Sequence, residues 1–426
     1  MGRTERALRR HQPEIGKDSS LSATTPSEAA PLAKPAAPTG KDGRRRNYSI
    51  DFMRVVLFSC VVMVHAVGTI NYGPDIDRQM AGLSMLMHYT RYGFVFITVF
   101  VLFLGYYHRD TKATTFWRRR FGLVVLPYLL WSIIYSVWEP LVRSADPWPG
   151  WQAVAYDTVL QIVKGDAKYH LYFLLISMQI YLLFPALRWL VRKTTGHHGK
   201  LLCGAIAIQL AAMLWVTVLP GPQHPALVLL HQHVWKLFPM YVLFAAMGAL
   251  AAVHFDRAHS WVTRNWVLML PVILLGFGIS TGVYLYRSGQ GVAPHLAASA
   301  QHPSMLAWAV VSIIALYLVA SAWNERRGDG RGLVGRAVDL GAIRAFGVYA
   351  AHPILIDVLH RVGFGSWLFE TFPNSTLVRS SLLVLATFAI TLVVVEVLLR
   401  SPLSKLLVAR PRQPIRKRQE PEPARG

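Results

Sequence analysis

Three ionisable side chains, Asp51, Arg54 and His65, lie in the first long apolar segment of the sequence. At about 100° and about 1.5 Å per residue, a helix places them on one face, with Arg54 and His65 roughly 16 Å apart along the axis. A neutral imidazole can take a proton from an alcohol near neutral pH, and a carboxylate can stabilise the imidazolium that forms. The pattern is therefore typical of a general base, His65, on a helix that carries a charged pair near one end.

A structural interpretation of the same residues is also open. Asp51 and Arg54 could form an i,i+3 pair that anchors the helix at the membrane interface, while His65 only forms a hydrogen bond with a neighbouring helix. A charged group at the centre of a membrane helix costs about 2.5 to 3.5 kcal/mol on insertion scales, so ionisable side chains there usually serve a function. This cost favours the functional interpretation of His65.

Long apolar segments must position these side chains. Hydrophobic residues make up 53% of the 426-residue chain and charged residues 15%, with a positive mean hydropathy. The composition predicts an all-α integral membrane protein, a bundle of about ten transmembrane helices. The predicted spans cover residues 50–69, 92–107, 119–138, 170–191, 201–219, 235–253, 266–286, 303–323, 343–360 and 377–399. The second and ninth are the shortest of these.

The basic residues indicate the orientation of the chain. Most of the 44 lysine and arginine residues fall in the two tails and the even-numbered connectors between spans. Positive charge collects on the cytoplasmic side of membrane proteins, so both termini are expected in the cytoplasm. Because these residues sit at helix ends and in tails, the net charge of +22 does not indicate a nucleic-acid partner. Contact with anionic membrane lipid is expected instead.

The composition divides the chain into three segments. Residues 1–47 read as a disordered basic cytoplasmic tail, residues 48–400 as the ten-helix transmembrane domain, and residues 401–426 as a basic, Pro-rich cytoplasmic tail. The two cysteines, Cys60 and Cys203, lie in or beside apolar segments, which excludes a disulfide framework. Chemistry is therefore expected inside the bundle.

Four motifs in chain order resemble those of the membrane-bound acyltransferase-3 family. They are Asp51-x-x-Arg54 with His65; Phe116-Trp117-Arg118-Arg119-Arg120 with Leu126-Pro127-Tyr128 and Trp131; His170-Leu171-Tyr172-Phe173 with Gln179-Ile180-Tyr181 and Pro185; and Phe346-Gly347-Val348-Tyr349-Ala350-Ala351-His352-Pro353. The resemblance covers nearly everything from Ile50 to Arg400. It implies a membrane O-acyltransferase of a bacterial inner (plasma) membrane. Such an enzyme moves an acyl group, often acetyl, from cytoplasmic acyl-CoA to a hydroxyl of a cell-surface glycan or glycolipid.

The basic cluster Arg118, Arg119 and Arg120 is the expected binding site for the donor. CoA carries several phosphate charges, and arginine forks bind phosphate bidentately. Arginines also cap the cytoplasmic ends of membrane helices for topological reasons alone, so a role in topology stays open. The sequence has Leu123 where the family often has a second arginine three residues after Arg120.

Four further side chains are candidates for the site. His352 precedes Pro353, whose missing N–H permits a kink that could line a cavity, and Tyr349 belongs to the same motif. His170, at the outer start of the fourth span, either contacts the acceptor or lies at the interface. Glu139 either binds sugar hydroxyls and orients His65, or is a solvated helix end.

Other polar pairs have simpler interpretations. His231 and His233 point to different faces of a helix and lack a third ligand, so no metal site is expected. Two acid–base pairs at i,i+4 spacing are expected to form ion pairs that lower the energetic cost of burying their charges: Asp357 with Arg361, and Glu396 with Arg400.

Two other classes of protein share some of these features. A transporter or flippase of a surface glycan or lipid intermediate would also carry intramembrane charges along its path. A non-catalytic scaffold would explain the helices but neither Arg54 nor His65. Direct transfer and transfer through an acyl-histidine both remain open, as do the acyl group, the acceptor and the oligomeric state.

Overall fold

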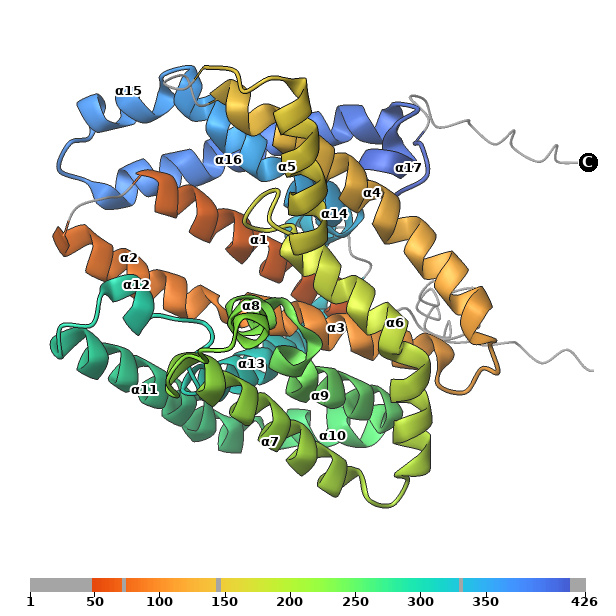
Figure 1. Cartoon of the computed structure of the whole chain (residues 1–426). Helices are drawn as coiled ribbons and strands as arrows, with labels where there is room; N and C mark the ends of the chain where they lie inside the picture. The colour runs from red at the N-terminus through yellow and green to blue at the C-terminus, as the bar shows by residue number, and fades with distance from the viewer. Residues whose placement is uncertain (1–47, 71–73, 143–146, 329–331, 414–426) are drawn as a thin grey trace, which may run out of the picture. The chain divides into compact units, whose positions relative to one another are not determined.

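The computed structural model describes residues 48–70, 74–142, 147–328 and 332–413 (Figure 1). Every regular element within these residues is a helix. The predicted N-terminal tail, residues 1–47, and residues 414–426 of the predicted C-terminal tail lie outside the described residues.

Ten helical segments are long and apolar enough to cross a membrane. They are α1 (Tyr48–Ile70), α2 with α3 (Arg78–Tyr106), α4 (Ala113–Val142), α6 (Tyr172–Lys193), α7 (His198–Thr217), α8 to α9 (Pro225–Val253), α11 (Trp266–Gly289), α13 (Met305–Arg326), α14 (Leu333–Arg361) and α16 (Thr376–Arg400). The short helices between or after them are α5 (Trp151–Lys164), α10 (Phe255–Arg264), α12 (Pro294–Ala297), α15 (Phe364–Thr371) and α17 (Ser404–Leu407). The predicted all-α, ten-span fold is confirmed, whereas a cytoplasmic position of the termini stays a prediction.

The second and ninth spans are longer than predicted. Each has 29 residues, beginning at Arg78 and Leu333, and in each 61% of the apolar window is buried. Polar residues such as Arg91 and Arg344 interrupt the hydropathy of these segments, so the sequence pattern places the helix starts too late. The helices continue because their polar side chains face the protein interior rather than lipid. The second span is divided at His88 into α2 (Pro74–Met87) and α3 (Tyr89–Tyr106).

Helix α1 lies among α3, α13, α14 and α16. Its side chains Met53, Leu57 and Val62 are fully buried against these neighbours. A helix that is apolar on most sides and surrounded by other helices is fixed in position, which is what a residue meant for chemistry requires. The surroundings of α1 therefore hold both Arg54 and His65 in place.

Among the described helices, α3 and α9 (Val242–Val253) share the most extensive contact. Gly248 permits it, because a Cβ at this position would lie only 2.4 Å from the backbone oxygen of Phe96. Backbone atoms of α3 cannot yield locally, so any side chain at Gly248 must push the two helices apart.

We expect Gly248→Ala to lower the stability of the folded protein by about 1 to 3 kcal/mol through overpacking. The measurement is the apparent melting temperature in detergent. Gly204→Ala in α7 is the matched control, because a Cβ there meets no atom within 4 Å. Equal melting temperatures for the two variants would contradict the close crossing.

The chain folds back on the bundle after α16. The indole nitrogen of Trp131 in α4 donates to the carbonyl of Leu407 at 2.9 Å, and Val408 is fully buried. Ala409 then turns the chain in the left-handed region, with φ of 54°. Figure 1 shows α17 beside α4 at this end of the bundle. We call residues 401–413 the C-terminal hook.

One of the two predicted acid–base pairs forms. Glu396 pairs with Arg400 at 2.5 Å and also with Arg344 of α14. The other prediction is wrong, since Arg361 donates to the carbonyls of Leu141 and Val142. Asp357 instead accepts from Lys168 at 3.1 Å and from the Trp138 indole at 3.1 Å. These donors from other parts of the chain take the place of Arg361, which lies one turn further along α14.

Candidate active site

Three histidines from distant parts of the chain meet inside the bundle. His65 of α1 stacks on His352 of α14 with ring centroids 5.5 Å apart, and His170, just before α6, meets His352 edge to face at 5.3 Å. Tyr169 covers the other side of the His65 ring at 4.3 Å. The structure therefore brings together three of the predicted site histidines, which the sequence separates by more than a hundred residues at each step.

Pro353 explains how the His352 ring is held. Proline has no N–H, so in the continuous helix α14 the carbonyl of Tyr349 lacks its usual backbone donor. The Nδ1 atom of His352 lies 2.8 Å from this oxygen and 3.2 Å from that of Val348, and it takes the place of the missing donor. A proton fixed on Nδ1 leaves Nε2 with its lone pair. Nε2 is buried and has no hydrogen-bond partner among the described residues.

His170 is buried rather than interfacial. Only 3% of its surface is exposed, and both ring nitrogens are buried without a hydrogen-bond partner in the described part of the chain. The rings of Tyr135 and Tyr349 contact it at 5.4 and 5.0 Å. The Tyr349 hydroxyl donates to the His170 backbone carbonyl, which holds the segment before α6 against α14. The interface interpretation of His170 is therefore wrong, because the chain enters α6 through the bundle and not along its surface.

Burial lowers the pKa of His170 well below its ordinary value of 6.5, and the nearby His352 and His65 rings act in the same direction. An unfolded chain therefore binds a proton near pH 6 that the folded protein does not bind, so stability falls as the pH drops below 6.5. We expect a lower melting temperature at pH 5.5 than at pH 7.5, and a smaller difference in His170→Gln. The exposed His197→Gln is the control; an identical pH dependence in all three proteins would contradict a neutral, buried His170.

The histidine cluster borders a cavity of about 180 Å³, which we call the histidine cavity. Besides His65 and His170, two basic side chains that are not among the predicted site residues line it, Arg91 and His88. The predicted span begins at residue 92, which leaves both residues in a connector. Their i,i+3 spacing within a helix that continues into the membrane is the signal that could have identified them.

A second cavity, of about 280 Å³, is lined by three arginines, one of them from the predicted donor site, and we call it the arginine cavity. Arg54 and Arg120 line it, together with Arg410 of the C-terminal hook. Asp51 holds Arg54 by an ion pair of 3.0 Å, and the Arg120 guanidinium lies 5.3 Å from the centre of the Tyr106 ring. These arginines lie near the start of α1, the start of α4 and the end of α16, which all belong to one side of the bundle.

The two cavities share a wall of three aromatic residues, Phe94, Phe173 and Tyr349. The rings of Phe94 and Phe173 lie 5.5 Å apart, and those of Phe173 and Tyr349 lie 6.4 Å apart. The arrangement can therefore hold one reactant on each side of a thin apolar partition, with His65 beside it.

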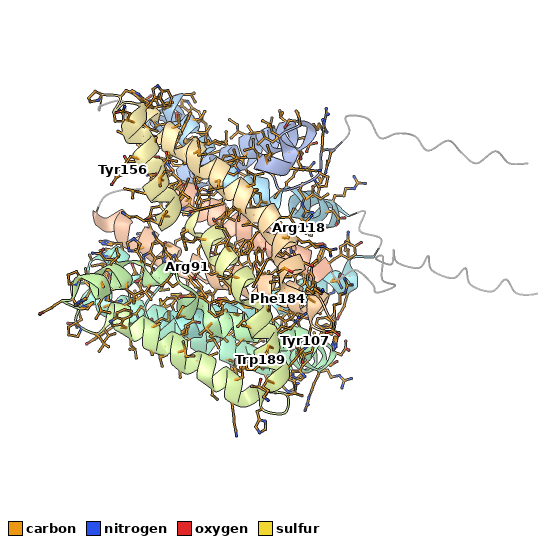
Figure 2. The ribbon with its side chains drawn as sticks, turned by 45° about the vertical axis from the view of Figure 1, so that its right-hand side comes forward. Arg91, Tyr107, Arg118, Tyr156, Phe184 and Trp189 are labelled. Carbon is orange, nitrogen blue, oxygen red and sulfur yellow. The ribbon has the colours of Figure 1, made fainter. Side chains whose placement is uncertain are left out.

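Five of the predicted site residues do not line either cavity. Two of them contact residues that do, since Asp51 pairs with Arg54 and His352 stacks on His65. The other three are Arg118, Arg119 and Glu139. Arg118, labelled in Figure 2, and Arg119 are exposed on α4, so only Arg120 of the basic cluster lines the arginine cavity. Leu123 is 52% exposed, and a second arginine at this position would point away from the cavity. Glu139 pairs with Lys168 at 2.8 Å and does not line the histidine cavity.

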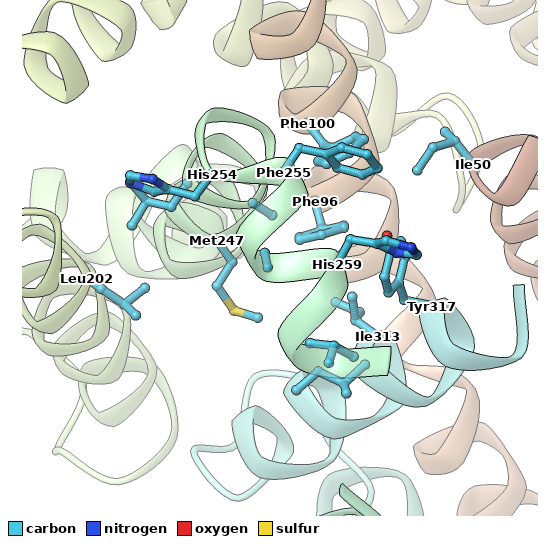
Figure 3. Close-up of a pocket in the computed structure, with 15 residues that line it drawn as sticks. Ile50, Phe96, Phe100, Leu202, Met247, His254, Phe255, His259, Ile313 and Tyr317 are labelled. Carbon is cyan, nitrogen blue, oxygen red and sulfur yellow. The ribbon is translucent and has the colours of Figure 1, made fainter. Parts of the chain in front are cut away.

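A larger apolar cavity, of about 350 Å³, lies between α3, α9, α10 and α13 (Figure 3). Its polar lining groups are two histidines at the rim and Tyr317, and His259 bonds the Tyr317 hydroxyl at 2.9 Å. It contains neither an arginine nor a member of the histidine cluster. The chemistry-bearing residues thus lie elsewhere, in the arginine and histidine cavities.

The comparisons with known proteins identify the family. The family model Acyl_transf_3, described as an acyltransferase domain, matches residues 47–396. The chain belongs to the acyltransferase-3 family. No curated protein and no solved structure matches it.

Membership in the acyltransferase-3 family confirms the resemblance found in the sequence and extends over all ten spans. The protein is therefore a multi-pass membrane acyltransferase. The matched region of the acyltransferase-3 family ends at residue 396, before the C-terminal hook that carries Arg410 into the arginine cavity.

Proposed function

We propose that the protein transfers an acyl group from acyl-CoA, bound in the arginine cavity, to a hydroxyl of a glycan or glycolipid, bound in the histidine cavity. The observation that carries the proposal is the shared aromatic wall, because only this layer of side chains separates the arginine-lined space from the histidine-lined space. An acyl group has to travel only across this wall.

The arginine cavity fits the chemistry of acyl-CoA. Arg54, Arg120 and Arg410 can bind the phosphates, since guanidinium forks form bidentate, charge-assisted hydrogen bonds with them. The rest of the lining is mainly apolar and suits the pantetheine arm and a short acyl chain. The thioester then lies near Phe94 and Tyr349, within reach of His65.

In the reaction, the His65 imidazole takes the proton from the acceptor hydroxyl while the hydroxyl oxygen attacks the thioester carbonyl. The carbon–sulfur bond breaks, and the departing CoA sulfur receives the proton from the His65 imidazolium. His352 stacks on the His65 ring at 5.5 Å and thereby holds its orientation. A variant in which His65 first accepts the acyl group and then passes it to the hydroxyl uses the same geometry.

The proposal also assigns a direction across the membrane. The arginine cavity lies toward the side where α1 begins and α16 ends, which the distribution of basic residues places in the cytoplasm, where acyl-CoA is made. The histidine cavity lies toward the opposite side, where a cell-surface glycan or glycolipid is available. We therefore propose an inner (plasma) membrane location with both termini in the cytoplasm.

The test is acceptor-dependent release of CoA by purified protein. We expect free CoA to accumulate when acetyl-CoA is supplied together with a surface-glycan or glycolipid extract, and acetyl ester to appear on the extract. Movement of acceptor across a membrane without CoA release would contradict the proposal and favour a transporter or flippase.

Arg410 supplies a prediction specific to the C-terminal hook. Its guanidinium is held by the Ala342 carbonyl at 3.3 Å, and its own carbonyl accepts from the Ser404 hydroxyl at 2.8 Å. We expect Arg410→Ala to raise KM for acetyl-CoA about tenfold, because one charged hydrogen bond to phosphate is lost. Acetyl-pantetheine lacks the nucleotide phosphates, so its KM should not change.

Arg412→Ala is the matched control, because Arg412 donates to the Arg400 carbonyl and does not line the cavity. An equal rise in KM for both donors in Arg410→Ala would show that the substitution disturbs the fold of the hook and would contradict phosphate binding by Arg410.

A further inference from the structure

Of the described residues, Arg91 of α3 is the one that brings a permanent charge into the lining of the histidine cavity. Figure 2 labels it within the bundle. It is partly buried, and its guanidinium lies 6.0 Å from the centre of the Tyr172 ring, another residue of the cavity wall. None of the ion pairs among the described side chains includes Arg91.

An arginine without a carboxylate partner inside a membrane span is costly, and such residues usually face a cavity in which a ligand supplies the opposite charge. The buried lysines pair with carboxylates, Lys168 with Glu139 and Asp357, and Lys236 with Asp166. The buried Arg379 donates to the backbone carbonyls of Phe372 and Pro373. Arg91 instead lies among tyrosines and bonds Tyr241. Like Arg120 in the arginine cavity, it lines a cavity and has no carboxylate partner among the described residues.

The rest of the histidine cavity does not supply a negative charge. Its polar lining consists of histidine, tyrosine, serine and threonine side chains, and the described lining contains neither aspartate nor glutamate. A cavity that is lined by neutral groups and one cation favours a negatively charged ligand over a neutral one of the same shape. His65 and Arg91 line the same small cavity, so the anion of the ligand must lie close to the hydroxyl that reacts.

We propose that the acceptor carries an anionic group, a phosphate or a carboxylate, near the hydroxyl that is acylated, and that Arg91 recognises this group. The inference rests on the proposed function and narrows its acceptor to anionic glycans or glycolipids. Arg91 acts as a specificity-determining residue, because its guanidinium fork fixes the anion on α3 and thereby places the hydroxyl near His65 on α1. Phosphate and carboxylate share this chemistry, and the experiment separates them.

The first measurement is binding of three small probes to the purified protein: methyl glucoside, methyl glucuronide, and the phosphate ester of methyl glucoside. The inference predicts that the parent binds at least one of the anionic probes about tenfold or more tightly than the neutral glucoside. Tighter binding of the glucuronide indicates a carboxylate site, and tighter binding of the phosphate ester indicates a phosphate site. Arg91→Gln should remove the preference, whereas Arg78→Gln, an exposed arginine on the same span, should retain it.

The second measurement is the rate of acyl transfer to the same probes from acetyl-CoA. For the anionic probe, Arg91→Gln should raise KM about tenfold with little change in kcat, and should leave KM for the neutral glucoside unchanged. A fall in kcat for all probes would overturn the inference and assign Arg91 to the charge that develops on the carbonyl oxygen. Equal binding of neutral and anionic probes by the parent would also overturn it, while CoA release from the parent would still support the proposed function.

Discussion

His65→Ala is expected to reduce acyl transfer by about a hundredfold to ten-thousandfold, the range typical for the loss of a general base. The reason is geometric as well as chemical. His65 lies beside the shared aromatic wall, stacked on His352 at 5.5 Å and covered by Tyr169 at 4.3 Å. Among the described residues no carboxylate lines the histidine cavity to take over the proton. The measurement is initial rates of CoA release with a saturating acceptor.

The loss must come from chemistry rather than from unfolding. His65→Ala should therefore retain its elution volume and helical content, and it should bind acetyl-CoA as tightly as the parent does. The exposed His197→Gln should keep full activity. Retention of more than about a tenth of parental activity in a folded His65→Ala protein would contradict the role of general base.

Arg54→Ala is expected to raise KM for acyl-CoA by about tenfold to a hundredfold, with a smaller effect on kcat. Arg54 is held by Asp51 at 3.0 Å with its side chain still 30% exposed, so the fork is fixed and can still reach a phosphate. Arg54→Lys keeps the charge but loses the fork, and it should give an intermediate KM.

Two variants separate donor binding from a general effect of charge. Asp51→Asn removes the group that holds Arg54 and should raise KM less than Arg54→Ala does. Arg118→Ala removes an exposed arginine outside the arginine cavity and should leave KM unchanged. An equal rise in KM for Arg54→Ala and Arg118→Ala would indicate that surface charge, and not the cavity, attracts the donor.

The sequence predicts the membrane fold well because few backbone structures are stable in the hydrocarbon core of a membrane. Ten apolar stretches must be helices, since only helices satisfy their own backbone hydrogen bonds in lipid. The i,i+3 spacing of Asp51 and Arg54 is sufficient to predict their ion pair, which lies within a single helix. His65 is identifiable for the same local reason, as an ionisable residue on that helix.

The residues that sequence patterns misplace are those whose positions depend on contacts between distant elements. His170 reads as interfacial because it begins a span, yet a bond from Tyr349, far along the chain, holds its segment inside. Arg410 belongs to a basic tail by composition, but Val408 and the bond from Trp131 fold that segment onto the bundle. No local periodicity encodes such contacts.

The second and ninth spans illustrate the same limit. A hydropathy pattern assumes that polar residues avoid the membrane, whereas Arg91 and Arg344 lie inside helices because they face a cavity or a carboxylate. The pattern therefore shortens the helices that carry the most polar interior groups. Those helices also contribute the histidine cavity and its shared wall.

Transfer across the bilayer tests the central claim most directly. Protein reconstituted in sealed liposomes would receive acetyl-CoA with a labelled acetyl group on the outside and acceptor extract only on the inside. The account predicts label on the enclosed acceptor with the parent and none with His65→Ala, since the donor and acceptor cavities meet within the membrane. Label that appears only when donor and acceptor share one side would contradict it.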